Sequence, residues 1–247
     1  MDTTLDSLWD FAPAAAGRMF HLEHFAGLPQ VTQKYLEHAI APGTLLANAV
    51  RLRMHGEIKL KRWLPFTAEQ VIRRDGGMIW KATVRMFGLP IRGFDRLIDG
   101  EGAMHWRLLG LIPIMSASGA DITRSAAGRV AAELIWLPSA MCADETSWVP
   151  RDASHAQARI SVARITTEVD LGVDDDGRLQ SIALQRWGNP EGAEFHNVAF
   201  GGIADREQTF DGYTIPTRLR VGWYFGSARF ESEGEFFRVT VDDARFR

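Results

Sequence analysis

The sequence predicts a mainly β fold of the α+β class: a curved antiparallel sheet or incomplete barrel of about ten strands, with N-terminal helices and a central helical plug. Apolar and polar residues alternate through most of residues 48–109 and 157–247, which is the period of strands with one buried face. A helical period separates these two stretches, at residues 116–146. So wide a sheet usually curls, splits or closes, and we expect one curved sheet around the helical segment in a single domain, residues 1–247.

Residues 1–43 are predicted to form helices. The segment LDSLWDF suits a short helix that Pro13 interrupts, and AAAGRMFHLEHFAG suits a second one that Gly27 closes. Leu28-Pro29 opens a third helix, because proline is favoured in the first turn, and Pro42-Gly43 ends it.

Residues 48–109 are predicted to form a five-stranded antiparallel meander, with turns at 75–77, 88–90 and 99–102. Its first strand alternates most clearly, so that one face is buried and the other is wet. The residues expected on the buried face are Val50, Leu52, Met54, Ile58 and Leu60.

The helical plug is expected within residues 116–146. Val130, Leu134 and Leu137 recur at i, i+4 and i+7, which places them on one helix face. Pro138 is expected to end the helix near Leu137, because proline disfavours helix at the residue before it and lacks an N–H. Gly128 would allow a close approach of this helix to the sheet.

Residues 157–247 are predicted to form a second meander. The alternation in ARISVARITTEVDLGV slips near Ala163-Arg164, which indicates a β-bulge inside one long strand. The run Asp174 to Gly177 is interpreted as a hairpin turn and not as a calcium loop, since an EF-hand spreads its ligands over about twelve positions.

Composition excludes several classes of protein. The formal net charge is −3, so no overall basic field points to nucleic acid or to an anionic membrane. The single cysteine, Cys142, excludes an internal disulfide and a cysteine-rich zinc site. No run approaches the roughly 18 apolar residues of a spanning helix, and the N-terminus lacks the basic region of a secretory signal, so we expect no integral membrane segment and a cytoplasmic location. The oligomeric state does not follow from the sequence.

The common catalytic and metal-binding motifs are missing from the sequence: there is no G-x-S-x-G elbow, Walker loop or dinucleotide-binding G-x-G-x-x-G. His21 and His24 lie three residues apart, but no third ligand is spaced to complete a zinc site. Nothing pairs Cys142 with His105 or His155 as a nucleophile and base. We therefore expect no metal and no cofactor.

Arg129 and Glu133 are the candidate functional pair, because they lie one helical turn apart beside the apolar stripe of the plug. A buried pair would join helix to sheet, anchor a polar end of an apolar pocket, or act as a general acid/base couple. Asp95 and Arg186 are the sheet residues expected next to them. His105 is a weaker candidate neighbour, because it shares a strand face with Arg107, opposite Met104 and Trp106, which favours the outer face of the sheet.

Tryptophans are the candidate ligand-binding residues. Trp80, Trp106 and Trp223 fall in phase with the apolar faces of predicted strands, and Trp136 lies on the plug. They either fill the core or line a site for a bulky apolar ligand, since such sites are mainly aromatic and aliphatic.

The outline resembles the lipoprotein-localisation-factor fold, an incomplete antiparallel barrel whose helices cover an apolar hollow, over about residues 45–247. The sequence also resembles a family of uncharacterised bacterial proteins of unknown function. That likeness rests on Leu28-Pro29 with Tyr35-Leu36, the turn Asp99 to Met104, Arg129 with Glu133, and Trp136-Leu137-Pro138. This second resemblance implies no activity.

Three functions remain open at this point. The first is binding of a hydrophobic small molecule, a lipid or an acyl chain in the hollow of the curved sheet. The second is an acid/base enzyme on the same scaffold, an isomerase, cyclase or hydrolase that uses Glu133. The third is a scaffold or interaction protein with a filled core.

Overall fold

The computed structural model describes residues 4–13, 15 and 17–247. Its described residues form one antiparallel sheet of thirteen strands in the order β6-β5-β4-β3-β2-β1-β13-β12-β11-β10-β9-β8-β7. The strands are β1 Ala49–Lys59, β2 Trp63–Arg73, β3 Met78–Met86, β4 Leu89–Ile98, β5 Glu101–Leu108, β6 Ile112–Ser118, β7 Ser147–Pro150, β8 His155–Val162, β9 Ile165–Val173, β10 Leu179–Gly188, β11 His196–Phe210, β12 Tyr213–Trp223 and β13 Glu235–Phe246. Two meanders, β1–β6 and β7–β13, therefore join where the last strand pairs with the first, and the predicted mainly β class is confirmed.

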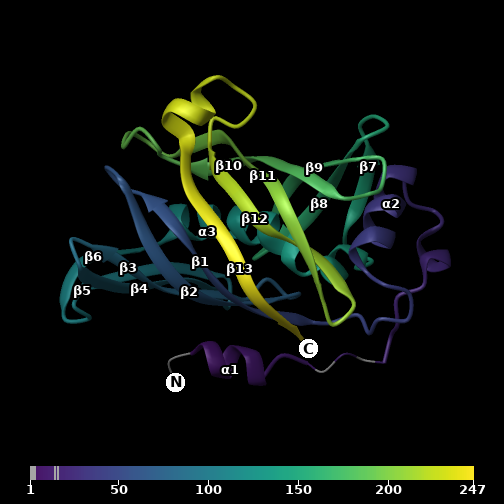
Figure 1. Ribbon diagram of the computed structural model, residues 1–247, viewed down its shortest axis with the longest axis horizontal. Helices are drawn as coiled ribbons and strands as arrows, with labels where there is room; N and C mark the ends of the chain where they lie inside the picture. The colour runs from purple at the N-terminus through teal and green to yellow at the C-terminus, as the bar shows by residue number, and fades with distance from the viewer. Residues whose placement is uncertain (1–3, 14, 16) are drawn as a thin grey trace.

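The sheet curves around the central helix α3, Ala120–Glu133 (Figure 1). This helix contacts β4, β5 and β6 of one meander and β8, β9 and β10 of the other. Ala127, Val130 and Ala131 on the helix are fully buried, so the main core lies between the helix and the concave face of the sheet. The helical plug is thus where the sequence predicted it.

The end of the plug differs from the prediction. The α-helix ends at Glu133, and two 3₁₀ helices follow, Leu134–Trp136 and Pro138–Cys142. Pro138 occupies the first turn of the second of these, where its missing N–H costs nothing. Its side chain is buried, so Pro138 contributes to the core as well as interrupting the helix.

The first strand follows the predicted register through Met54. Val50, Leu52 and Met54 are at most 2% exposed, and they lie on the face that meets the core. Ile58 is half-buried, but Leu60 is 61% exposed, since β1 ends at Lys59 and the chain turns there. The prediction for Leu60 was therefore wrong.

The predicted bulge at Ala163-Arg164 is a hairpin turn. Ala163 and Arg164 have φ of 50° and 63°, and Val162 pairs directly with Ile165 across the turn. Two successive left-handed residues match the right-handed twist of a hairpin. One predicted strand is therefore two, β8 and β9.

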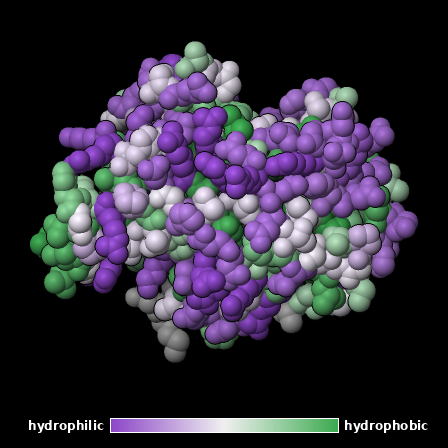
Figure 2. Space-filling view, viewed as in Figure 1, coloured by the Kyte–Doolittle hydropathy of each residue, from purple (hydrophilic) through white to green (hydrophobic). Residues whose placement is uncertain are grey.

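Strand β6 was not predicted, and it is one free edge of the sheet. Its residues are nearly all exposed, including Ile112 and Ile114. Figure 2 shows a hydrophobic patch at the left of the molecule, where Figure 1 places β5 and β6. Pro113 lacks a donor, which is typical of edge strands.

The N-terminal helices are shorter than predicted. Helix α1, Leu5–Asp10, packs Leu5 and Leu8 on Val71 and Ile79, on the opposite side of the sheet from the plug. The predicted second helix is reduced to a 3₁₀ turn, Leu22–Phe25, and residues 14 and 16 of that segment lie outside the described residues. None of the helices described is long and apolar enough to cross a membrane.

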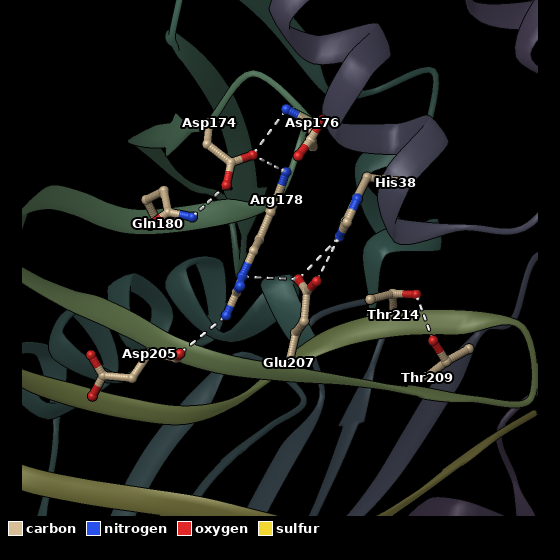
Figure 3. Close-up of polar contacts among 9 residues, drawn as sticks. All are labelled: His38, Asp174, Asp176, Arg178, Gln180, Asp205, Glu207, Thr209 and Thr214. Carbon is tan, nitrogen blue, oxygen red and sulfur yellow. Dashed lines mark hydrogen bonds and ion pairs between the residues drawn. The ribbon is translucent and has the colours of Figure 1, made fainter.

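Helix α2, Gln30–Ala39, is fastened to the second meander by a polar network (Figure 3). Nε2 of His38 lies 3.0 Å from both carboxylate oxygens of Glu207 on β11, and Glu207 is 3.6 Å from Nε of Arg178. Arg178 directly follows the predicted hairpin turn, Asp174 to Gly177, and Oδ1 of Asp174 accepts from the backbone N–H groups of Asp176 and Arg178. These contacts support the interpretation of this run as a turn.

Candidate functional site

Arg129 joins the plug to the sheet through two carboxylates. Its Nε donates to Oε1 of Glu133 at 2.7 Å, and its Nη1 donates to Oδ2 of Asp95 on β4 at 2.8 Å. The three side chains are only 17%, 15% and 20% exposed, in the order Arg129, Glu133 and Asp95. The structure thus brings together the predicted pair and one of its two predicted neighbours.

Each carboxylate accepts a second hydrogen bond from the sheet. Nε2 of Gln70 on β2 donates to Oε2 of Glu133 at 2.6 Å, and Nε1 of Trp106 on β5 donates to Oδ1 of Asp95 at 3.1 Å. Both oxygens of each acid are therefore in use, as buried charges require. Burial opposes the charge on Arg129, but Glu133 and Asp95 outweigh burial and raise the pKa of Arg129.

Arg186, the other predicted neighbour, has no carboxylate partner among the described residues. On β10 it donates from Nε to the carbonyl oxygen of Ser125 at 3.2 Å and from Nη2 to Oγ of Ser125 at 3.4 Å. Burial and the positive charge of Arg129 lower the pKa of Arg186 to about 10, against the opposing effect of Glu133 and Asp95. Arg186 remains charged at neutral pH, in a place that disfavours its charge.

Seven aromatic rings form a continuous belt across the middle of the sheet. Neighbouring ring centroids along the belt lie between 4.9 and 6.4 Å apart, within the usual range for aromatic pairs. In order, the aromatic belt is Phe200, Trp223, Phe236, Phe237, Phe66, Trp80 and Trp106.

Both arginines of the site lie over the aromatic belt. The guanidinium carbon of Arg186 is 4.6 Å from the ring centroid of Phe200 and 5.2 Å from that of Trp223. That of Arg129 is 5.1 Å from the Trp80 centroid. Cation–π contacts of this kind compensate part of the cost of burying a guanidinium group.

The belt is closed at its ends and accessible in its middle. Trp80, Trp106, Phe66 and Phe200 are at most 7% exposed, whereas Trp223, Phe236 and Phe237 are half-buried. The accessible part includes Trp223, the ring that lies against Arg186. The guanidinium group of Arg186 and an accessible aromatic surface thus lie side by side.

Two glycines make room for the belt. A Cβ on Gly93 would lie 2.4 Å from Cδ2 of Trp106, and one on Gly188 would lie 2.3 Å from Cη2 of Trp223. Glycine therefore lets Trp106 lie on the backbone of the neighbouring strand β4, and lets Trp223 of β12 reach across β11 to the backbone of β10. These glycines and the phenylalanines of the belt were not predicted as site residues, although glycines within predicted strands are a signal of such close packing.

Two buried polar atoms beside the ion pair find no partner among the described residues. They are Nε1 of Trp80 and Oε1 of Gln70, and the two residues face each other across β2 and β3. Buried polar atoms of this kind are usually satisfied by water or a ligand.

The contacts of the remaining candidate residues indicate packing or local hydrogen bonding. Trp136 is 4% exposed and donates from Nε1 to the carbonyl oxygen of Pro216 at 2.9 Å, which is a packing role. Burial raises the pKa of Cys142 to about 12, so its thiol is a poor nucleophile. His105 is hydrogen-bonded to Ser116, and His155 to Asp152, rather than to Cys142. No cluster of metal-binding side chains occurs in the described part of the chain.

Residues 26–246 match the model of a family of unknown function, DUF6920. The chain belongs to this family. The predicted membership of an uncharacterised family is therefore confirmed. No curated protein matches the sequence.

Two solved structures are similar to this one in outline. One is a domain assigned to outer membrane lipoprotein sorting, from Vibrio parahaemolyticus, with 8% identity over 81% of this chain and 86% of that chain, and a TM-score of 0.39. The other is a LolA superfamily protein from Nitrosomonas europaea, with 10% identity over 88% of this chain and 92% of that chain, and a TM-score of 0.42. Both likenesses concern the outline of the fold, as does the predicted resemblance to the lipoprotein-localisation-factor fold, and nothing about binding follows from them.

Proposed function

We propose that the concave face binds an amphiphile that has an apolar chain and an acidic end group, such as a fatty acid. Arg186 receives the acidic group, and the accessible part of the aromatic belt receives the chain. The observation that carries this proposal is a half-buried guanidinium that has no carboxylate partner among the described residues and lies against half-buried aromatic rings.

The acidic end group follows from the surroundings of Arg186. Burying a charge without a counter-charge is costly, and the nearby carboxylates already pair with Arg129. Among the described residues Nη1 of Arg186 has no acceptor, and its Nη2 makes only a 3.4 Å contact to Ser125. A carboxylate or phosphate would accept from this fork in a bidentate way.

The apolar chain follows from the rings beside it. Trp223, Phe236 and Phe237 keep exposed surface although they pack against the main core. Covering apolar surface contributes about 25 cal/mol per Å², so a chain laid on these rings gains affinity without any polar contact. Of the tryptophans predicted as ligand-binding residues, Trp80 and Trp106 continue the same belt as buried rings, whereas Trp136 keeps the packing role described above.

The test is a fluorescence titration with a series of fatty acids, because a ligand beside Trp223 changes tryptophan emission. Arg186→Gln is expected to weaken binding by roughly tenfold or more, since it removes a charged hydrogen bond. The matched control is Arg218→Gln, which removes a guanidinium from an exposed position on β12 and should leave affinity unchanged. Equal affinity of Arg186→Gln and the wild type would contradict the role of Arg186.

Acid/base catalysis through Glu133 has no comparable observation behind it, because both of its oxygens are occupied by Arg129 and Gln70. That alternative, the filled scaffold and the cytoplasmic location all stay predictions.

A further inference from the structure

Exposed apolar side chains gather at three neighbouring hairpin tips. The tip surface comprises residues 59–63, 85–92 and 107–115. Eight large apolar side chains in it are between 46% and 76% exposed: Leu60, Phe87, Leu89, Leu109, Leu111, Ile112, Ile114 and Met115. Soluble monomers rarely expose so many large apolar side chains together, and such a patch marks an interaction site.

The three tips form one continuous surface. The guanidinium carbon of Arg62 lies 3.8 Å above the ring of Phe87, which joins the first tip to the second. The backbone N–H of Leu109 donates to the carbonyl oxygen of Pro90 at 2.8 Å, which joins the third tip to the second. The hydrophobic patch at the left of Figure 2 lies at this end of the sheet.

The tip surface is also basic. It contains six cationic residues and no acidic residue, although the whole chain has a net charge of −3. The cations are Lys59, Lys61, Arg62, Arg85, Arg92 and Arg107. Apolar hairpin tips with lysines and arginines near them suit a partner that has negatively charged groups at its surface and an apolar interior beneath them.

The same charges argue against a second copy of this chain as the partner. Two identical tip surfaces facing each other would bring six cations against six cations, which is repulsive. An anionic bilayer supplies the opposite charge and an apolar interior for Phe87 and Leu111.

We propose that the tip surface docks on an anionic phospholipid bilayer, with Phe87 and Leu111 inserted and the surrounding cations on the headgroups. Docking is a separate property from the ligand site at Arg186. The tip surface lies next to the aromatic belt, because Ile58 on β1 pairs with Phe237 of the belt and the first tip begins at the next residue, Lys59. The two surfaces consist of different residues, so both properties can occur in one molecule.

The test is flotation of the purified full chain with vesicles of phosphatidylcholine alone and of phosphatidylcholine mixed with phosphatidylglycerol. The wild type is expected to float with the anionic vesicles and to bind neutral ones about tenfold more weakly, with binding lost at high salt. The double variant Phe87→Ser with Leu111→Ser should bind the anionic vesicles at least about tenfold more weakly. Its matched control is Phe11→Ser, because Phe11 is 78% exposed and Phe87 is 75% exposed.

Charge is tested separately with Lys61→Glu and Arg107→Glu together, against Arg218→Glu as control. The tip variant should lose the preference for anionic vesicles, and the control should keep it. All the substituted side chains are exposed, so thermal unfolding should be unchanged in each variant.

Three outcomes would overturn docking: no flotation of the wild type, equal flotation of the wild type and the Phe87→Ser/Leu111→Ser variant, or a dimer in solution that this double variant abolishes. The Arg186→Gln variant should float like the wild type, so failure of the ligand site and failure of docking are distinguishable.

Discussion

Arg129 holds the plug to the sheet, since it pairs with Glu133 of the plug and with Asp95 of β4. We predict that Arg129→Ala destabilises the protein by roughly 3–5 kcal/mol, because Glu133 and Asp95 would remain buried without a counter-charge. The measurement is the free energy of unfolding in urea.

The control for Arg129 is Arg124→Ala, on the same helix but exposed. It should cost no more than about 1 kcal/mol, although Arg124 lies over the ring of Trp187. Similar small losses in both variants would mean that the Arg129 network contributes little.

Individual residues of the site were predictable to different degrees. The pair Arg129 and Glu133 follows from helical spacing, because that pattern is local in sequence, whereas the contact of Arg129 with Asp95 depends on how the helix packs on the sheet. That Arg186 donates to Ser125 and pairs with no acid is a matter of tertiary placement, which no local pattern contains. The belt was missed because its rings come from six strands, and Phe237 becomes a neighbour of Phe66 only after β13 returns to β1.

At the scale of elements, the alternation of β1 is the clearest link from sequence to structure. We predict that Met54→Asp unfolds or aggregates the protein, because Met54 is 2% exposed in the main core and cannot carry a lone carboxylate. Lys59→Asp, at the end of the same strand, should change stability by less than about 1 kcal/mol. Soluble expression and thermal unfolding measure both, and equal tolerance would show that the register is wrong.

Elements without a one-face period were the ones mispredicted. Strand β6 is exposed on both sides, so its apolar residues do not alternate with polar ones. The turn at Ala163-Arg164 places two residues with side chains at positive φ, without the glycine or asparagine that usually signals it. The segment AAAGRMFHLEHFAG has helix formers, but Met19 forms an isolated β-bridge with Leu45 instead.

At the scale of the whole molecule, the net charge does not show where the charged residues lie. A net charge of −3 gave no reason to expect an anionic membrane, yet six cations and no acid lie on three hairpin tips. Only the fold shows that residues 59–63, 85–92 and 107–115 are neighbours. Composition gives the net charge of a protein, but not the charge of one part of its surface.

The wide curved sheet was predictable because strand count and short turns limit the possible arrangements. Its curvature was also foreseeable in outline, since two meanders on either side of one helix can both contact that helix only if the sheet curves. The strand pattern does not predict the pairing of β1 with β13, which joins the first and last strands of the chain in the middle of the sheet.

The most direct test of the central claim is native mass spectrometry of the full chain mixed with a long-chain fatty acid and the fatty alcohol of the same length. The proposal predicts one bound acid per chain in the wild type, little bound alcohol, and loss of the acid in Arg186→Gln. Equal loading of acid and alcohol, or an acid adduct that survives Arg186→Gln, would contradict it.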